Sequence, residues 1–160
     1  MTAVLREKII FSDMLYEQHT ASPDFGMLVS SGLPENRQTG EVREMEPLRY
    51  MKNIPGEQVL DLAGMVEAGH GQVVSRTLAQ NPAVSVTLFA FDKGEEISTH
   101  ASGGDAMVTV LEGVGKFTVD GVEHLARQGQ TLVMPAGKPH AVYAQEAFKM
   151  LLVVVFPPAP

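Results

Sequence analysis

The histidines are the residues of this sequence best suited to chemistry, because its 160 residues include no cysteine. An imidazole titrates near neutral pH, so it can act as a general acid or base, and its neutral form is a common metal ligand. Three of the five histidines, His100, His124 and His140, lie in the strand-like second half of the chain, and the spacing of the glycines around them singles out His100 and His140. Ser102 and Asp105 follow His100 closely and add a hydroxyl and a carboxylate. These four residues form the candidate ligand pocket.

The absence of cysteine excludes several classes of site. Disulfide scaffolds, thiolate zinc sites, iron–sulfur clusters and cysteine nucleophiles all require thiols. Any metal bound here must therefore rest on histidine and oxygen ligands. The sequence also contains no nucleophile-elbow, phosphate-loop or dinucleotide-binding motif, and no H-E-x-x-H zinc motif.

Charge and hydropathy indicate a cytoplasmic protein. The 19 acidic residues outnumber the 12 basic ones, for a net charge of −7, which disfavours nucleic acid and anionic membranes as partners. The longest apolar run, Met150 to Phe156, is far shorter than the ~20 residues of a membrane-spanning helix. Arg6, Glu7 and Lys8 lie where a signal peptide would need apolar residues.

The second half of the chain reads as a series of short strands. Alternating apolar residues are separated by turn signals every 8–12 residues or so, the spacing of an antiparallel sandwich or barrel. Asp120-Gly121 is a two-residue hairpin signal. No helical pattern interrupts the series, so a parallel α/β sheet is not expected. The expected strands are 72–78, 84–91, 106–111, 116–119, 122–126, 131–134, 140–144 and 148–156.

The first half of the chain lacks this pattern. Apolar residues at helical spacing predict a short amphipathic helix over 3–17, and turn clusters predict an extended loop over 20–45. Asp61 is placed to cap a short helix that ends near Gly69. We therefore divide the chain into an N-terminal extension, residues 1–55, and a β-barrel domain, residues 56–160.

Alternation along the strands predicts which side chains face the barrel interior. Residues of one parity share a face, so Ala106, Val108 and Val110 should lie together. Met107 has the opposite parity and should face outward, against a partner subunit or the N-terminal arm. If His140 faces inward, Val142 does too, which predicts an apolar interior with two imidazoles near one mouth.

Gly94 precedes His100 by six positions, Gly113 closes this first series, and the residues from Gly129 to His140 form a second series. This spacing resembles the two motifs of the cupin family. In the first motif, G-x5-H-x-H-x3-E-x6-G, Gly94, His100 and Gly113 match. The resemblance covers roughly residues 70–157. It implies an all-β double-stranded β-helix, the cupin or jelly-roll barrel, with the N-terminal region as an extension. In the second motif, G-x5-P-x-G-x2-H-x3-N, the matching residues are Gly129, Pro135, Gly137 and His140.

The sequence departs from the family at its metal-ligand positions. Ser102 stands where the first motif has its second histidine, and Ala106 stands where it has glutamate. The resemblance implies a divalent metal ion (Zn, Fe, Mn or Ni), for which His100 and His140 would be the ligands. Asp105 could replace the glutamate only if a bulge at Gly103-Gly104 turned it inward.

The sequence leaves open whether the protein is an enzyme. One hypothesis is binding of a small molecule, through a weak histidine-based metal site or the imidazoles themselves, with isomerase- or epimerase-type proton transfer. The alternative is a non-catalytic small-molecule-binding or sensor cupin without metal. We expect a homodimer that binds neither nucleic acid nor membrane. His19, His70 and His124 are expected to make only local contacts, with His124 facing solvent.

Overall fold

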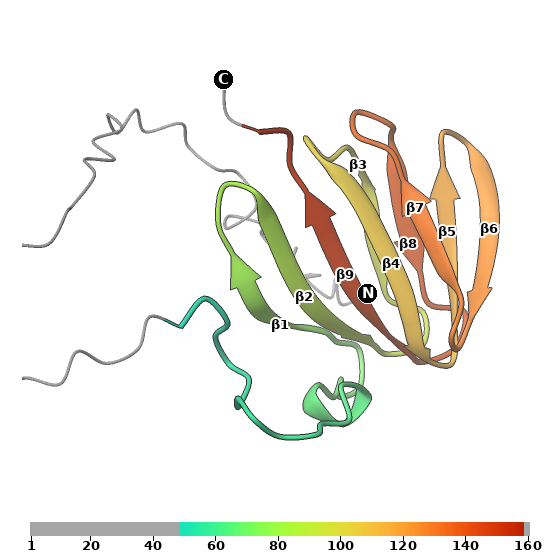
Figure 1. Ribbon diagram of the computed structural model, residues 1–160. Coiled ribbons are helices and arrows are strands. Elements are labelled where there is room, and N and C mark those ends of the chain that lie inside the picture. Colours follow the sequence, from blue (N-terminus) through green and yellow to red (C-terminus); the bar gives the residue numbers. More distant parts are fainter. Residues whose placement is uncertain (1–48, 159–160) are drawn as a thin grey trace, which may run out of the picture. The chain divides into compact units, whose positions relative to one another are not determined.

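The computed structural model describes residues 49–158 of the chain (Figure 1). These residues belong to a compact unit that spans Met45–Pro160. The helix expected over 3–17, the loop over 20–45 and most of the 1–55 extension lie outside the described residues. No helix within 49–158 is long and apolar enough to cross a membrane.

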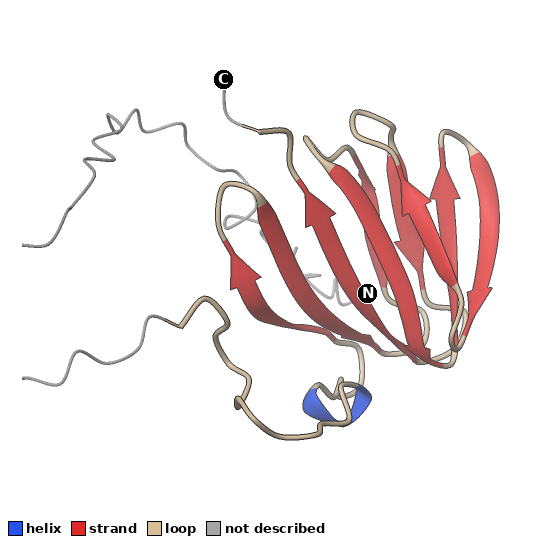
Figure 2. Cartoon of the chain, viewed as in Figure 1, coloured by secondary structure: helices blue, strands red, loops and turns tan. Residues whose placement is uncertain are grey.

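The described residues form nine strands in two antiparallel sheets, with one short helix (Figure 2). The five-stranded sheet has the order β1-β2-β9-β4-β7, and the four-stranded sheet has the order β3-β8-β5-β6. The last strand, β9, lies between β2 and β4 (Figure 1). The bounds are β1 Val73–Gln80, β2 Val84–Phe91, β3 Glu96–His100, β4 Asp105–Glu112, β5 Val114–Val119, β6 Val122–Arg127, β7 Thr131–Met134, β8 His140–Tyr143 and β9 Phe148–Val155.

All eight expected strands are present, and the all-β barrel architecture is confirmed. Asp120 and Gly121 both have positive φ, 51° and 81°, and link β5 to β6 as the hairpin signal predicted. Strand β3 was not expected. Ile97 is its single buried residue, and a register shift follows Ile97, so no clean alternation marks this strand.

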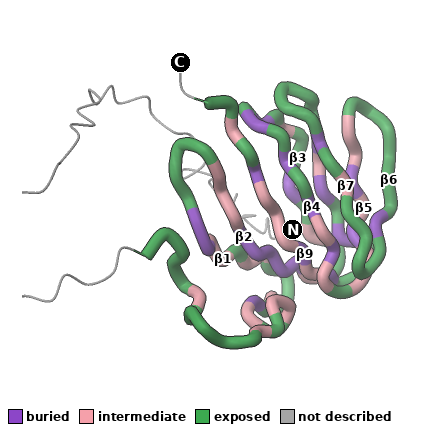
Figure 3. Tube along the Cα trace, viewed as in Figure 1, coloured by how far each residue is buried: buried purple, intermediate pink, exposed green. Residues whose placement is uncertain are grey.

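The barrel interior is filled by large side chains at one end. Phe91, Phe117, Phe148 and Met150 are almost fully buried. Figure 3 shows buried stretches along β2 and β4. The rings of Phe91 and Phe148 stack with centroids 4.7 Å apart. Strand β9 begins with the large Phe148, and the smaller Val154 lies near its end. The interior side chains of β9 therefore become smaller toward the opposite end of the barrel.

Strand β4 has the expected parity. Ala106, Val108 and Val110 are buried, whereas Met107 is 39% exposed on the outer face. Val142 is also buried, as its parity with His140 predicted. The homodimer expected from the sequence stays a prediction.

The outer face of β1 and β2 carries a second apolar core. Leu78, Leu88 and Ala90 pack there with Val66 and with partly buried residues that precede β1. The helix expected from Asp61 to Gly69 is reduced to one 3-10 turn, Ala63–Met65. Asp61 still accepts a hydrogen bond from the N–H of Ala63. The partly buried members of this core are Ile54, Leu62, Met65, Ala68, Val74, Val86, Leu111 and Leu151.

Candidate functional site

The structure brings His100 and His140 together at one end of the barrel. Strand β3 ends at His100, β8 begins at His140, and the two residues are paired directly across the strands. Their ring centroids are 4.4 Å apart, with an angle of 65° between the ring planes. The juxtaposition inferred from motif spacing is therefore present.

Backbone carbonyls orient both rings. Nδ1 of His100 lies 2.9 Å from the carbonyl oxygen of Ser98, and Nδ1 of His140 lies 2.9 Å from that of Lys138. A carbonyl oxygen only accepts, so Nδ1 donates in each case. In a neutral imidazole the other nitrogen, Nε2, then carries no proton and can accept a proton or a hydrogen bond.

Burial keeps His140 neutral. Its side chain is only 3% exposed. Burial lowers the pKa of His140 below its ordinary value, and proximity to His100 lowers it further, while the contact with Lys138 raises it. At neutral pH the ring is therefore an uncharged base.

Ser102 is also buried at this end of the barrel. Its Oγ accepts a hydrogen bond from the N–H of Gly104, and its carbonyl accepts one from the N–H of Gly137. The second bond joins the loop that follows His100 to the turn that precedes His140. Because Oγ acts as an acceptor in the first bond, its own proton is available for donation.

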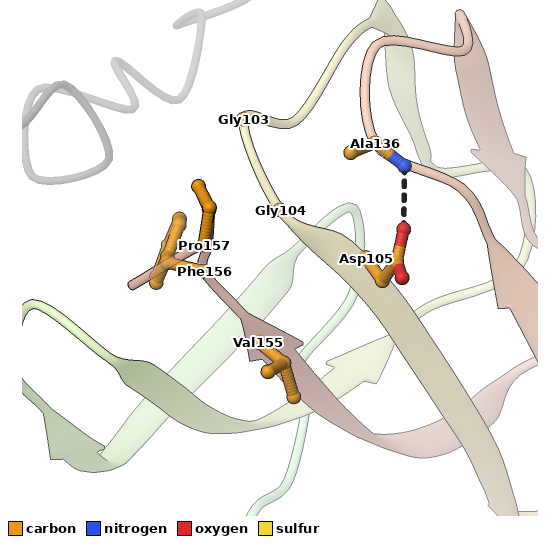
Figure 4. Close-up of a pocket in the computed structure, with 7 residues that line it drawn as sticks. All are labelled: Gly103, Gly104, Asp105, Ala136, Val155, Phe156 and Pro157. Carbon is orange, nitrogen blue, oxygen red and sulfur yellow. Dashed lines mark hydrogen bonds between the residues drawn. The ribbon is translucent and has the colours of Figure 1, made fainter. Parts of the chain in front are cut away.

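The structure does not bring Asp105 together with the histidines. Asp105 pairs regularly with Val155 in the sheet, and no bulge at Gly103-Gly104 turns it inward. Its exposed carboxylate accepts a hydrogen bond from the N–H of Ala136, at 2.8 Å from Oδ1 (Figure 4). It lines a separate outer pocket of about 250 Å³ with Gly103, Gly104, Ala136, Val155, Phe156 and Pro157.

The described residues do not form a complete site for a tightly bound transition metal. Such sites use three or more protein ligands, and within 49–158 no three histidine, cysteine, aspartate or glutamate residues are grouped so that they could hold a metal ion. Ala106, at the glutamate position of the first motif, and Ala144, at the asparagine position of the second, are buried methyl groups. The two imidazoles are the donors that a metal would find here.

The other described histidines lie apart from this site. Nδ1 of His70 is 3.2 Å from a carboxylate oxygen of Asp92, and the His70 side chain is fully exposed. His124 is exposed on β6, as expected. His19 lies outside the described residues.

Sequence reasoning missed Thr87, a buried polar residue of β2. It pairs with Leu152 and has the parity of Phe89 and Phe91, opposite to Leu88, which packs in the outer core. Thr87 and Ser85 therefore face the interior. The polar positions of a half-buried strand normally face water, but here the residues around the 3-10 turn cover the other face. The apolar residues before β1 were the sequence signal that could have indicated a covered outer face of β2, and therefore an interior Thr87.

Comparisons with known proteins agree with this architecture. The model of the cupin domain family matches residues 87–156. A cupin superfamily protein from Desulfitobacterium hafniense is 36% identical, with a TM-score of 0.64 over 67% of this chain and 98% of its own. The chain belongs to the cupin superfamily. Its motifs place it with the conserved-barrel cupins.

Other similar structures leave the activity of this cupin open. A conserved protein of unknown function from Streptococcus pyogenes is 51% identical, with a TM-score of 0.68 over 70% of this chain and 98% of its own. A cupin 2 conserved barrel domain protein from Leptotrichia buccalis is 44% identical, with a TM-score of 0.59 over 60% of this chain and 47% of its own. No curated protein matches the chain significantly.

Proposed function

We propose that this cupin binds a small carbonyl or hydroxy compound at the histidine end of its barrel, with His140 as a general base for proton transfer. The observation that carries the proposal is the state of His140. The ring is buried, its Nδ1 donates to Lys138, and burial favours the neutral form. Its Nε2 is then a base whose orientation is set before any ligand binds.

The proton transfer would proceed as an enolisation. Nε2 of His140 takes a proton from the carbon next to a carbonyl, the C–H bond breaks, and its electron pair moves to form an enolate. Return of a proton to the same carbon, after the imidazolium has exchanged with solvent, completes an exchange. In a hydroxycarbonyl compound, transfer of the hydroxyl proton to the enolate oxygen and return of the imidazolium proton to the neighbouring carbon complete an isomerisation. The hydroxyl proton of Ser102 is suited to stabilise the enolate oxygen, because the Oγ–Gly104 bond uses Ser102 only as an acceptor.

The polar positions of β2 support a polar ligand. Ser85 and Thr87 have interior parity on the sheet that faces β3 and β8. Thr87 is a buried polar residue, only 8% exposed, and no fully buried side-chain oxygen or nitrogen in the described chain is left without a hydrogen-bond partner. Its interior hydroxyl is a group that a polar ligand in the barrel could meet.

Exchange with heavy water tests the proposal. We would incubate the full chain with dihydroxyacetone or pyruvate in D2O near neutral pH and follow loss of the C–H proton signals by NMR. The protein should exchange these protons faster than an equal concentration of free imidazole. His140→Ala should slow exchange by about a hundredfold or more, within the ~10²–10⁴-fold range of general base catalysis. The exposed His124→Ala is the matched control and should leave the rate unchanged.

Three other outcomes contradict the proposal, each in its own way. Binding of a probe, seen as shifted His140 ring signals, without any exchange would indicate the non-catalytic binding cupin. Exchange that is lost on EDTA treatment and restored by Zn²⁺ or Mn²⁺ would indicate the histidine-based metal site instead. Neither binding nor exchange with either probe would remove small carbonyl compounds as ligands.

A further inference from the structure

Asp105 is the first carboxylate that follows His100 in the sequence, yet it faces away from the histidines. Strand β4 begins at Asp105, and the register with Val155 places its side chain on the outer face. The neighbouring Ala106 points inward and is 2% exposed. In this outward position the carboxylate accepts a hydrogen bond from the N–H of Ala136.

Ala136 belongs to the turn that crosses from one sheet to the other. Strand β7 ends at Met134 in the five-stranded sheet, and β8 begins at His140 in the four-stranded sheet. Within the turn, the N–H of Lys138 donates to the carbonyl of Pro135. The carbonyl of Lys138 in turn accepts the Nδ1–H of His140. The position of this turn therefore sets the orientation of the His140 ring.

Two hydrogen bonds hold this turn to the first residue of β4 and to the loop before that strand. The N–H of Ala136 donates to Oδ1 of Asp105 at 2.8 Å, and the N–H of Gly137 donates to the carbonyl of Ser102 at 2.9 Å. The bonds engage consecutive turn residues. Figure 4 shows the Asp105 side chain reaching the turn from beside the outer pocket.

We propose that Asp105 is a positioning residue for His140. It holds the 135–138 turn so that the Lys138 carbonyl stays in line with Nδ1 of His140. Outer groups that orient a functional imidazole through its second nitrogen have this role in many histidine sites. This role of Asp105 rests on the proposed function, in which His140 is the base. The orientation of the His140 ring can nevertheless be measured without any activity.

The test reads the tautomer of His140 by ¹⁵N NMR at fixed neutral pH. In the wild-type chain the proton should reside mainly on Nδ1. Asp105→Ala should raise the ratio of the Nε2–H to the Nδ1–H tautomer about fivefold, the factor associated with one neutral hydrogen bond. Asp105→Asn keeps an accepting oxygen and should behave as the wild type. Amide exchange at Gly137 should quicken in the alanine variant only.

Thr109→Val is the matched control. The hydroxyls of Thr109 and Thr131 also join β4 to β7, at 2.9 Å, but away from the turn. An unchanged tautomer ratio in Asp105→Ala, or an equal change in Thr109→Val, would overturn the proposal. A changed tautomer ratio of His140 in Asp105→Asn would show that the negative charge of Asp105, and not its hydrogen bond to Ala136, orients the ring. The asparagine variant can be measured even if the alanine variant does not fold. Failure of the exchange assay with an altered tautomer would count against the proposed function alone.

Discussion

His140 lies directly opposite His100 across β3 and β8, and its ring is the more deeply buried of the two. The edge-to-face packing leaves 4.4 Å between the ring centroids. At that separation a positive charge on one ring disfavours protonation of the other, and this repulsion contributes to the lowered pKa of His140. The pair is therefore suited to hold a base in its neutral form.

The lowered pKa of His140 predicts that the protein loses stability on mild acidification. The ordinary pKa is 6.5, so unfolded chains take up this proton at a higher pH than folded ones. Stability is then full above about pH 7 and falls as the pH passes through 6.5, until the folded form is also protonated. Urea unfolding of the wild type should give a smaller free energy at pH 5.5 than at pH 7.5.

His140→Gln tests whether this ring is the cause. The variant should show a smaller loss between the two pH values, because glutamine does not titrate. His124→Gln, at an exposed site, should keep the wild-type loss. Equal pH dependence in the wild type and His140→Gln would contradict the prediction.

Thr87→Val tests the polar lining of the barrel. Valine keeps the shape of threonine, so the change removes a hydroxyl without leaving a cavity. We expect the free energy of unfolding to stay within about 1 kcal/mol of the wild type, because a single neutral hydrogen bond contributes only about that much. If the hydroxyl meets the ligand, probe binding followed by NMR should weaken by about three- to tenfold, as for one hydrogen bond.

Thr77→Val is the comparison for this change. Thr77 is paired with Thr87 on the neighbouring strand, but β1 is the edge strand of the sheet. Binding should be weakened less by Thr77→Val than by Thr87→Val. Unchanged probe affinity in Thr87→Val would place the ligand elsewhere.

Local patterns predicted most of the fold. Strand β2 was expected at its observed bounds, because Val84–Phe91 has strong β-propensity and clear turns on both sides. Strand β3 was missed because Glu96, Ser98 and Thr99 are exposed and a register shift breaks its alternation. A short polar strand is defined by its partner, here β8, and not by its own residues.

The sequence predicted only the part of the site that motif spacing alone determines. The motif spacing brought His100 and His140 together correctly. The direction of Asp105 depended on whether the two preceding glycines formed a bulge, which is a matter of pairing with β9. The interior position of Thr87 depended on residues 54–68 covering the other face of β2. Both are long-range facts that the local sequence does not contain.

Arg76 should hold the segment before β1 against the sheet. Its Nε donates to the carbonyl of Asn53, and its Nη1 donates to that of Met65. Arg76→Met should lower the free energy of unfolding by about 1–3 kcal/mol, since charged hydrogen bonds to a partly buried group are lost. Hydrogen exchange should show faster amide exchange at Lys52, whose N–H donates to Leu78.

Lys93→Met provides the contrast for Arg76→Met. Lys93 pairs with Glu146 on the surface, with both side chains more than half exposed. Its loss should change stability by less than about 1 kcal/mol and leave Lys52 exchange unaltered. Equal effects of the two variants would mean that Arg76 contributes no more than a surface ion pair.

Gly104 is the position before β4 where a side chain should be least tolerated. A Cβ there would lie 2.3 Å from the carbonyl oxygen of Val155 and 3.1 Å from Cα of Phe156. Both are backbone atoms, so relief requires β4 and the end of β9 to separate. Gly104→Ala should therefore lower the free energy of unfolding by about 1–3 kcal/mol, the usual range for overpacking.

Gly103→Ala is the control next to it in the chain. A Cβ at Gly103 would meet nothing within 4 Å, and its φ is not in the left-handed region. Its effect on urea unfolding should be within about 0.5 kcal/mol of zero, as for surface substitutions without special contacts. Because the shifted backbone in Gly104→Ala also carries Asp105, that variant should raise the Nε2–H tautomer of His140, whereas Gly103→Ala should not. Similar stability for the two alanine variants would show that β4 and β9 are not packed as closely at Gly104 as this structure has them.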